Sequence, residues 1–323
     1  MNNKKIYGIC HICGEEKALT FEHLPPRGAN NNSMAKAIVG DVLVKHIAGN
    51  DKPWDFSNCR YKSMQRGMGL YSICKECNNN TGANYAEEYI KLANTIGYAI
   101  RHEEIDKSAT GFTIYLKDFY VLRVIKQIYA MFASTLPETY MRERPDLQKF
   151  ILDKEYNNVD WSKYRLSVCA MKEGINGWTG IMSLAMQDKG KFGIKCVAEL
   201  VLYPLCFLLE FDPNGECDNT DITHLADDTD YNTMCDINLP LYYRSKNSFY
   251  PFDYRTKEEI ESDMKHNKEK TILEYKKMLS DKNINSSEAN ELIEKYKNSE
   301  IILGEFSDKI LNIIAENSSN GGD

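Results

Sequence analysis

The stretch CKECNNN at residues 74–80 joins a Cys-x-x-Cys pair directly to three asparagines. A second pair, CHIC at residues 10–13, lies upstream, and residues 14–73 separate the two. Each pair lets two thiolates turn onto one ion, and two pairs complete the tetrahedral four-cysteine site of structural zinc. We therefore predict a structural zinc ion. Its ligands would be Cys10, Cys13, Cys74 and Cys77.

The expected cellular setting favours zinc over the other uses of paired cysteines. The first residues, MNNKKIYG, are polar and basic and do not form a secretory signal. The longest apolar run, at 196–211, contains Glu199 and Pro204 and is too interrupted to span a bilayer. We expect a cytoplasmic protein without membrane contact, in which paired cysteines bind metal. A redox pair would require a thioredoxin-like βαβ unit, which the pattern does not contain.

The stretch FEHLPPRG at residues 21–28 places an acid and an imidazole next to two prolines. We predict a strand through LTFEHLPP, in which alternation turns Glu22 and His23 to opposite faces. The prolines end this strand and fix the direction of both side chains. Asparagines 78–80 would then open a helix that apolar spacing predicts over 83–98. The zinc would hold the strand against these asparagines.

The remainder of the chain predicts an α+β fold. Residues 28–72 carry few periodic signals and are expected to be an insertion between the two cysteine pairs. Asp118 is the expected N-cap of a strong amphipathic helix. Expected helices cover 118–134, 144–153 and, as charged helices, 256–316; expected strands form an antiparallel meander over 164–211 and a further strand at 237–244.

Charge is distributed unevenly along the 323 residues, whose net charge is −7. Residues 1–100 carry 12 Lys and Arg against 9 Asp and Glu, a net charge of +3. The remaining 28 basic and 38 acidic residues give −10, and the two parts sum to −7. The whole chain therefore does not have the composition of a nucleic-acid binder, whereas the first part can approach phosphates.

The order C-x-x-C, LT-x-EH-x-x-P and C-x-x-CNN-x-x-G resembles the HNH endonucleases of the ββα-metal fold, especially those with a structural four-cysteine zinc. The resemblance covers residues 8–95. It implies that Glu22 binds a divalent metal and that His23 is the general base that deprotonates the attacking water. It also implies that Asn78, or Asn79, is the second protein ligand of that metal.

Those residue types suit phosphodiester hydrolysis. An imidazole has a pKa near neutrality and can activate water, while a cation screens the phosphate and the leaving oxygen. Carboxylate and amide oxygens favour Mg²⁺ or Mn²⁺. Basic and polar side chains near the site are candidates for contacts to the phosphate backbone. These are Arg27, Lys62, Gln65 and Arg66.

Two positions depart from the family's pattern. The last metal ligand implied by the resemblance is asparagine and not histidine, which the family allows but which weakens metal affinity. The family's middle asparagine, which orients the histidine, sits shortly before the second cysteine pair, where this chain has Gly69. A backbone carbonyl, Asn58 or Gln65 would then have to orient His23.

The expected organisation is an HNH head at residues 1–100 and a body at 101–323 that serves dimerisation, recognition or regulation. The expected function is metal-dependent cleavage of DNA, with zinc as structural and Mg²⁺ or Mn²⁺ as catalytic ion. By analogy, such a nuclease would serve a defence system or a mobile element, with DNA and a second copy or a defence protein as partners. The alternative is a zinc-stabilised nucleic-acid- or protein-binding module without catalysis. A less supported alternative makes the body a small-molecule sensor.

Overall fold

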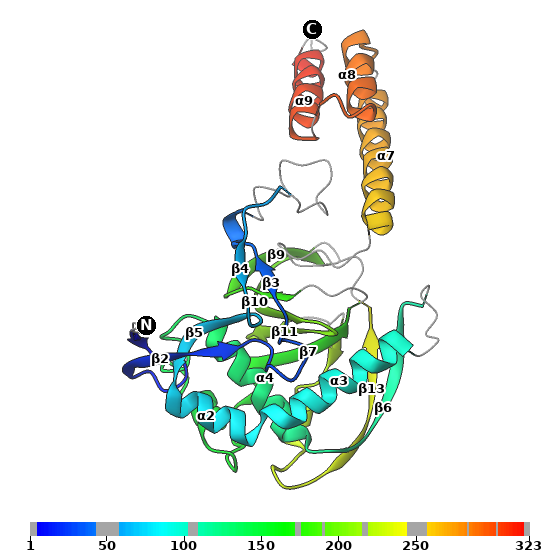
Figure 1. Ribbon diagram of the computed structural model, residues 1–323. Coiled ribbons are helices and arrows are strands. Elements are labelled where there is room, and N and C mark those ends of the chain that lie inside the picture. The colour runs from blue at the N-terminus through cyan, green and yellow to red at the C-terminus, as the bar shows by residue number, and fades with distance from the viewer. Residues whose placement is uncertain are drawn as a thin grey trace. The chain divides into compact units, whose positions relative to one another are not determined.

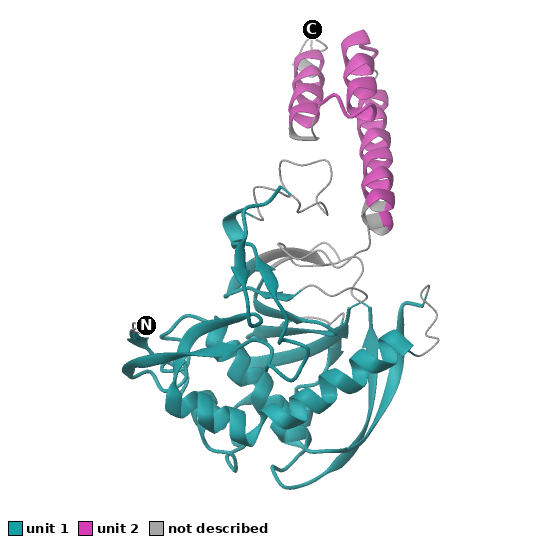
Figure 2. Cartoon of the chain, viewed as in Figure 1, with its two compact units in different colours: residues 1–254 teal, residues 255–323 magenta. Residues whose placement is uncertain are grey.

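The computed structural model describes residues 5–42, 58–102, 109–171, 176–188, 191–214, 219–243, 257–282, 284–301 and 303–319. The chain divides into two compact units, residues 1–254 and 255–323 (Figure 2). The expected boundary at residue 100 does not coincide with this division. Side chains from both sides of it, such as Ile73, Tyr89, Ile125 and Phe207, share one hydrophobic core.

A three-stranded sheet carries the candidate site. Its strands are β1 (Ile6–Ile9), β2 (Glu16–His23) and β5 (Gly69–Cys74), in the order β1-β2-β5, and both pairings are antiparallel (Figure 1). The predicted strand through Glu22 and His23 is thus confirmed as β2. His23 pairs with Gly69 at one end of the ladder, and Leu19 pairs with Cys74 at the other.

Two consecutive helices follow β5. Helix α2 (Lys75–Asn84) begins inside the second cysteine pair, and α3 (Ala86–His102) covers most of the range predicted as helix. The sequence suggested that asparagines 78–80 precede the helix at 83–98. They instead lie within α2, a separate helix that comes before α3. Helix α2 is polar and buries little, whereas α3 buries the apolar side chains expected from its spacing. These are Tyr89, Leu92, Ala93 and Ile96, and Tyr85 is buried just before the helix.

Helix α4 (Val121–Thr135) lies in the core of the first unit, and all but two of its 15 side chains are buried. Its polar side chains Lys126, Gln127 and Ser134 are buried together with the apolar ones, so other elements surround the helix on nearly all sides. The predicted N-cap is wrong: Asp118 belongs to strand β6 (Gly111–Phe119), and Tyr120 precedes the helix. Helix α5 (Pro145–Leu152) confirms the next predicted helix, with proline in its first turn.

The second sheet is antiparallel, as predicted, but its order is β12-β7-β11-β10-β8, with β9 also paired to β10. Because β10 is 12 residues long, β8 and β9 both pair along it while β11 occupies its other edge. Strand β7 consequently pairs beyond β11, and the sheet is not a simple meander. The strands are β7 (Tyr164–Ala170), β8 (Asn176–Trp178), β9 (Met182–Asp188), β10 (Lys191–Leu202), β11 (Leu205–Phe211) and β12 (Thr220–Asp221).

Two short ribbons complete the first unit. Strand β13 (Cys235–Tyr242) confirms the predicted strand and pairs with β6. Within the predicted insertion, β3 (Ala35–Ala37) pairs with β4 (Lys62–Met64), while residues 43–57 lie outside the described part of the chain. A short helix, α6 (His224–Asp227), and a 3₁₀ turn, Trp161–Lys163, connect the remaining strands.

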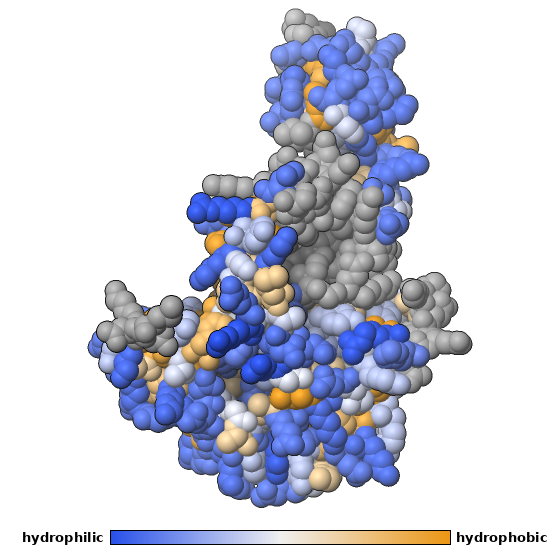
Figure 3. Space-filling model, viewed as in Figure 1, coloured by the Kyte–Doolittle hydropathy of each residue, from blue (hydrophilic) through white to orange (hydrophobic). Residues whose placement is uncertain are grey.

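The second unit is helical, as predicted for 256–316. It consists of α7 (Lys257–Asp281), α8 (Ser287–Lys297) and α9 (Leu303–Ser319), which enclose a separate apolar cluster around Ile293, Phe306 and Ile310. Ser286 caps α8 by accepting a hydrogen bond from the Ala289 N–H, at 3.2 Å. The visible surface of each unit is mainly hydrophilic (Figure 3). Among the described residues, no helix is long and apolar enough to cross a membrane.

The buried Lys126 of α4 offers a test of how α4 and α5 are joined. Its ammonium donates to the carbonyls of Phe150, Asp153 and Tyr156 at 2.5–3.1 Å. Lys126→Met keeps the approximate length of the side chain but leaves these carbonyl acceptors unpaired, so we expect the free energy of unfolding to fall by about 1–2 kcal/mol. Urea unfolding followed by tryptophan fluorescence measures this. The exposed Lys149→Met is the matched control, and equal midpoints for both variants would refute the assignment.

Candidate metal centre and active site

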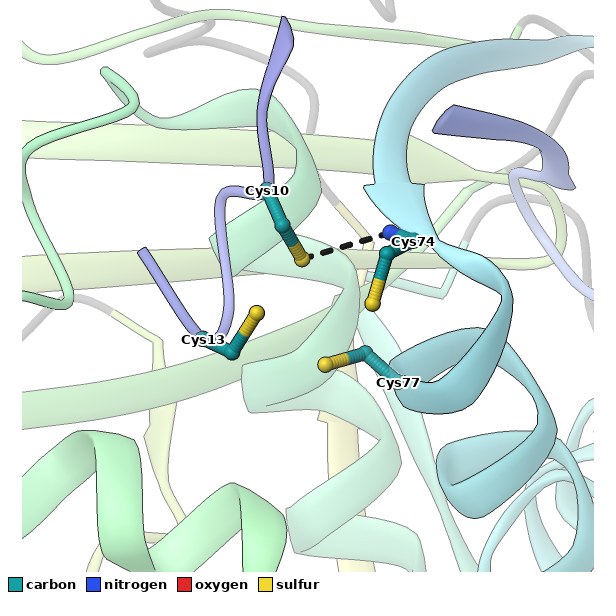
Figure 4. A group of neighbouring side chains, drawn as sticks. All are labelled: Cys10, Cys13, Cys74 and Cys77. Carbon is teal, nitrogen blue, oxygen red and sulfur yellow. Dashed lines mark hydrogen bonds between the residues drawn. The ribbon is translucent and has the colours of Figure 1, made fainter. Parts of the chain in front are cut away.

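The four cysteines of the two pairs come together at one point. Cys10 and Cys13 lie in the turn between β1 and β2, Cys74 ends β5, and Cys77 lies in the first turn of α2 (Figure 4). Their sulfur atoms all lie within 4.8 Å of one another. Four sulfurs around one zinc at 2.3 Å would be about 3.8 Å apart, so a small contraction would complete the shell. The cluster can therefore bind a metal ion such as zinc.

The first cysteine pair lies in a tight turn that directs the Cys10 and Cys13 sulfurs toward the same point. The Gly14 N–H donates to the Cys10 carbonyl at 2.8 Å, and Gly14 has a φ of 74°, which favours glycine. The Cys74 N–H donates to the Cys10 sulfur at 3.2 Å, across the two pairs (Figure 4). Cys74 is also the N-cap of α2, so the helix dipole stabilises negative charge on the cluster.

Protonation within the cluster agrees with a cation site. A hydrogen bond from the Cys77 thiol lowers the pKa of Cys10 to about 4. The same bond and burial raise the pKa of Cys77, and burial raises the pKa of Cys13 to about 11. The protein alone thus favours the thiolate at Cys10 and the thiol at Cys13 and Cys77. A bound dication would compensate the additional charges, which is how metal binding releases protons from such clusters.

Body segments hold the cluster in place. Gln148 of α5 donates to the Ile12 carbonyl, between the first two cysteines, at 2.8 Å. Asn80 of α2 donates to the Leu152 carbonyl at 2.9 Å, and the Tyr85 hydroxyl donates to the Ile151 carbonyl at 3.0 Å. The two cysteine pairs and α5 are therefore joined by direct hydrogen bonds.

Glu22 points into the core, on the face of β2 opposite to His23. Its side chain is 5% exposed and accepts a hydrogen bond from the Ser134 hydroxyl near the end of α4. Burial raises the pKa of Glu22 to about 8, although the bond from Ser134 lowers it. No sequence signal marks Ser134 as the partner, because the pattern of an amphipathic helix does not show which polar side chain near its end will be buried.

His23 ends β2 and is half-buried. Its ring Nε2 donates to the Arg66 carbonyl at 3.0 Å, and its ring stands edge-on to Phe21 with centroids 5.1 Å apart. Of the groups considered for orienting this histidine, it is a backbone carbonyl that contacts it, and not Asn58 or Gln65. Gly69 itself cannot be replaced by asparagine without rearrangement, because a Cβ there would overlap the Glu22 carbonyl oxygen.

The asparagines of α2 differ in their contacts. Asn78 donates through Nδ2 to the Thr20 hydroxyl at 3.1 Å and to the Phe21 carbonyl at 3.4 Å. Asn79 is exposed. Asn78 therefore contacts β2 at positions one to three residues before Glu22 and His23. Within the described residues, no hydrogen bond joins either asparagine directly to those two side chains.

The predicted phosphate contacts lie on exposed segments near His23. Arg27 is exposed in the turn after the prolines, and Lys62, Gln65 and Arg66 are exposed on β4 and the loop that follows it. The sequence did not indicate Lys36, which lies on the paired strand β3 with its ammonium 4.6 Å from the centre of the Tyr61 ring.

Comparison with known proteins adds no relationship: no protein family, curated protein or solved structure matches this chain.

Zinc binding is tested by removing one ligand. We expect the purified chain to hold about one zinc ion and Cys77→Ser to lose it, because three thiolates complete a tetrahedral site poorly. Cys235→Ser, at a half-buried cysteine of β13, should retain zinc. Elemental analysis gives the metal content, and calorimetry should show a lower melting temperature for Cys77→Ser alone. Equal zinc content in both variants would exclude the cluster as the metal site.

The buried Glu22 predicts a pH dependence of stability. Its pKa is raised from 4.5 to about 8 in the folded chain, so the stability that its proton contributes is present at low pH and is lost as pH rises through 8. Between about pH 5.5 and 8, without added magnesium, the wild type should lose about 3 kcal/mol relative to Glu22→Gln. Urea unfolding at several pH values measures this difference. Glu87→Gln, on the exposed face of α3, is the control; parallel curves for wild type and Glu22→Gln would contradict the burial of Glu22.

Proposed function

We propose that this chain is a metal-dependent endonuclease that hydrolyses phosphodiester bonds in DNA, with His23 as general base and Asn78 as metal ligand. The contact between Asn78 and the strand of His23 carries the proposal, because the Asn78 side chain lies against Thr20 and Phe21, the residues that precede Glu22 and His23. The order β2, β5, α2 around that cluster supports the resemblance to HNH endonucleases of the ββα-metal fold.

The roles follow from the atoms that remain available. The bond from His23 Nε2 to the Arg66 carbonyl leaves Nδ1 as the basic nitrogen, which can accept the proton of the attacking water. Asn78 uses Nδ2 for its bonds to β2, which leaves Oδ1 for a hard cation such as Mg²⁺ or Mn²⁺. Such an ion would polarise the phosphate and stabilise the leaving oxygen.

Glu22 would join the metal only after its carboxylate leaves Ser134 and turns away from the core. Metal binding by Glu22 and its hydrogen bond to Ser134 are therefore alternatives. We infer that water and substrate oxygens supply most of the metal shell, as they commonly do for Mg²⁺.

The substrate proposal rests on charge. The exposed side chains of Lys36 and Lys62 lie on the β3–β4 ribbon, and that of Arg60 lies just before β4. The exposed side chain of Arg66 lies in the loop between β4 and β5, which contacts His23 through the Arg66 carbonyl. Basic side chains in this place can neutralise phosphates on both sides of a scissile bond. The net charge of −7 confines this attraction to the neighbourhood of the ribbon.

A second candidate function is favoured by the burial of Glu22. The buried Glu22 side chain, hydrogen-bonded to Ser134, can have a purely structural role. A zinc-stabilised nucleic-acid-binding module without catalysis would have the same core. The two candidates differ at His23, since binding alone does not require a basic imidazole nitrogen.

The discriminating experiment compares cleavage of supercoiled plasmid, single-stranded DNA and RNA by the zinc-loaded chain with Mg²⁺ or Mn²⁺. His23→Ala should lower the rate by roughly 10²- to 10⁴-fold, the contribution of a general base. Asn78→Ala should lower it by roughly tenfold or more and should recover in part at higher metal concentration. His266→Ala, on an exposed face of α7, is the matched control and should cut like wild type.

Equal rates for wild type and His23→Ala would refute catalysis by this site. Binding of DNA by all variants, without cleavage by any, would instead establish the second candidate. Cleavage of RNA but not of DNA would keep the mechanism and correct the substrate.

A further inference from the structure

The bond that orients His23 comes from a loop that needs its own support. The Arg66 carbonyl belongs to the four-residue segment 65–68 between β4 and β5, which contains Gly67 and no regular helix or strand. A carbonyl in such a segment holds an imidazole in one orientation only if neighbouring residues fix the segment. Gly69, the position at which the family resemblance places the orienting asparagine, has no side chain that could do so.

Asn31 provides this support from another part of the chain. It lies beyond the prolines that end β2 and is 4% exposed. Its Nδ2 donates to the Met68 carbonyl at 2.8 Å and to the Pro25 carbonyl at 2.6 Å. Its Oδ1 accepts from the Met68 N–H at 2.7 Å. The buried Asn31 amide thus bonds both the N–H and the carbonyl of Met68, and it joins Met68 to the turn after His23 through the Pro25 carbonyl.

The neighbouring backbone is shaped to admit Asn31. Gly67 has a φ of 96°, and a Cβ at Gly67 would overlap the backbone carbonyl oxygen of Asn31. The Leu24 N–H also donates to the Met68 carbonyl at 3.0 Å, so that the residue after His23 is joined to the same point. Asn31, Gly67 and Met68 therefore form one closely packed unit on which Arg66 and His23 depend.

We propose that Asn31 is a positioning residue for His23: by holding Met68 it fixes the Arg66 carbonyl, which in turn fixes the orientation and tautomer of the imidazole. This inference rests on the proposed function, in which His23 is the general base. The side-chain amide suits the role, because it supplies the two donors and one acceptor that these backbone groups require. The bond from Nε2–H to a carbonyl keeps the proton on Nε2 and leaves Nδ1 to receive a proton.

Nuclear magnetic resonance tests the positioning without any reference to cleavage. In the wild type, the ring nitrogen shifts of the neutral form of His23 should show its proton on Nε2. Asn31→Ala and the isosteric Asn31→Asp, which removes both donated bonds, should give a mixture of tautomers. Asn32→Ala, at the exposed neighbouring asparagine, is the control. Zinc content and circular dichroism identify a variant that has simply not folded, in which case the other variant decides.

Kinetics test the consequence for the reaction. Asn31→Ala should lower kcat by roughly 10- to 100-fold, the usual cost of removing a group that orients a reacting one. In a His23→Ala background the same substitution should change neither the residual rate nor the Kd for DNA by more than about twofold, because it acts through His23.

The outcomes separate this inference from the proposed function. An unchanged His23 tautomer and an unchanged kcat in both Asn31 variants would overturn the inference while leaving a nuclease. A large loss of DNA affinity without loss of kcat would also overturn it, since Asn31 would then serve the binding loop. If the wild type cuts no nucleic acid, the proposed function fails, and the tautomer measurement still decides whether Asn31 positions His23.

Discussion

The convergence of Cys10, Cys13, Cys74 and Cys77 on one point is the constraint on which the candidate site depends. It fixes the turn before β2 to the junction of β5 and α2, although 60 residues, 14–73, separate the two cysteine pairs. With these ends fixed, β2 and β5 pair in a defined register, and Asn78 lies against Thr20 and Phe21. A metal ion is well suited to this role, because its binding energy compensates for the entropy of closing a long loop.

The same constraint joins the site to the rest of the first unit. The peptide between the first two cysteines accepts a bond from Gln148, and Glu22 accepts one from Ser134. The site thus packs on the core of the first unit, in which residues on both sides of position 100 share one apolar cluster. A displacement of α4 would move Glu22 as well, because the buried Ser134 of α4 donates a hydrogen bond to the buried Glu22 carboxylate.

Local sequence patterns correctly predicted the features that depend on residues close together in the chain. Cysteine spacing located the metal cluster, alternation and two prolines located β2, and helical periodicity located α3, α4 and α5. The contacts that complete the site come from distant segments and leave no pattern in sequence. Asn31 stands in a run of three asparagines, and only its burial distinguishes it. The strand order of the second sheet was likewise mispredicted, because the length of β10 and its two neighbours on one edge override sequential pairing.

The central claim is that His23 and Asn78 share one divalent-metal site beside the zinc cluster. Titration of the zinc-loaded chain with Mn²⁺, followed by nuclear magnetic resonance, tests it most directly, because a paramagnetic ion broadens the signals of nearby groups. The account predicts that the His23 ring and the Asn78 side-chain amide lose intensity together, before the ring of His224 on α6 of the same unit. Uniform broadening of all histidines, with no preference for His23 and Asn78, would contradict it.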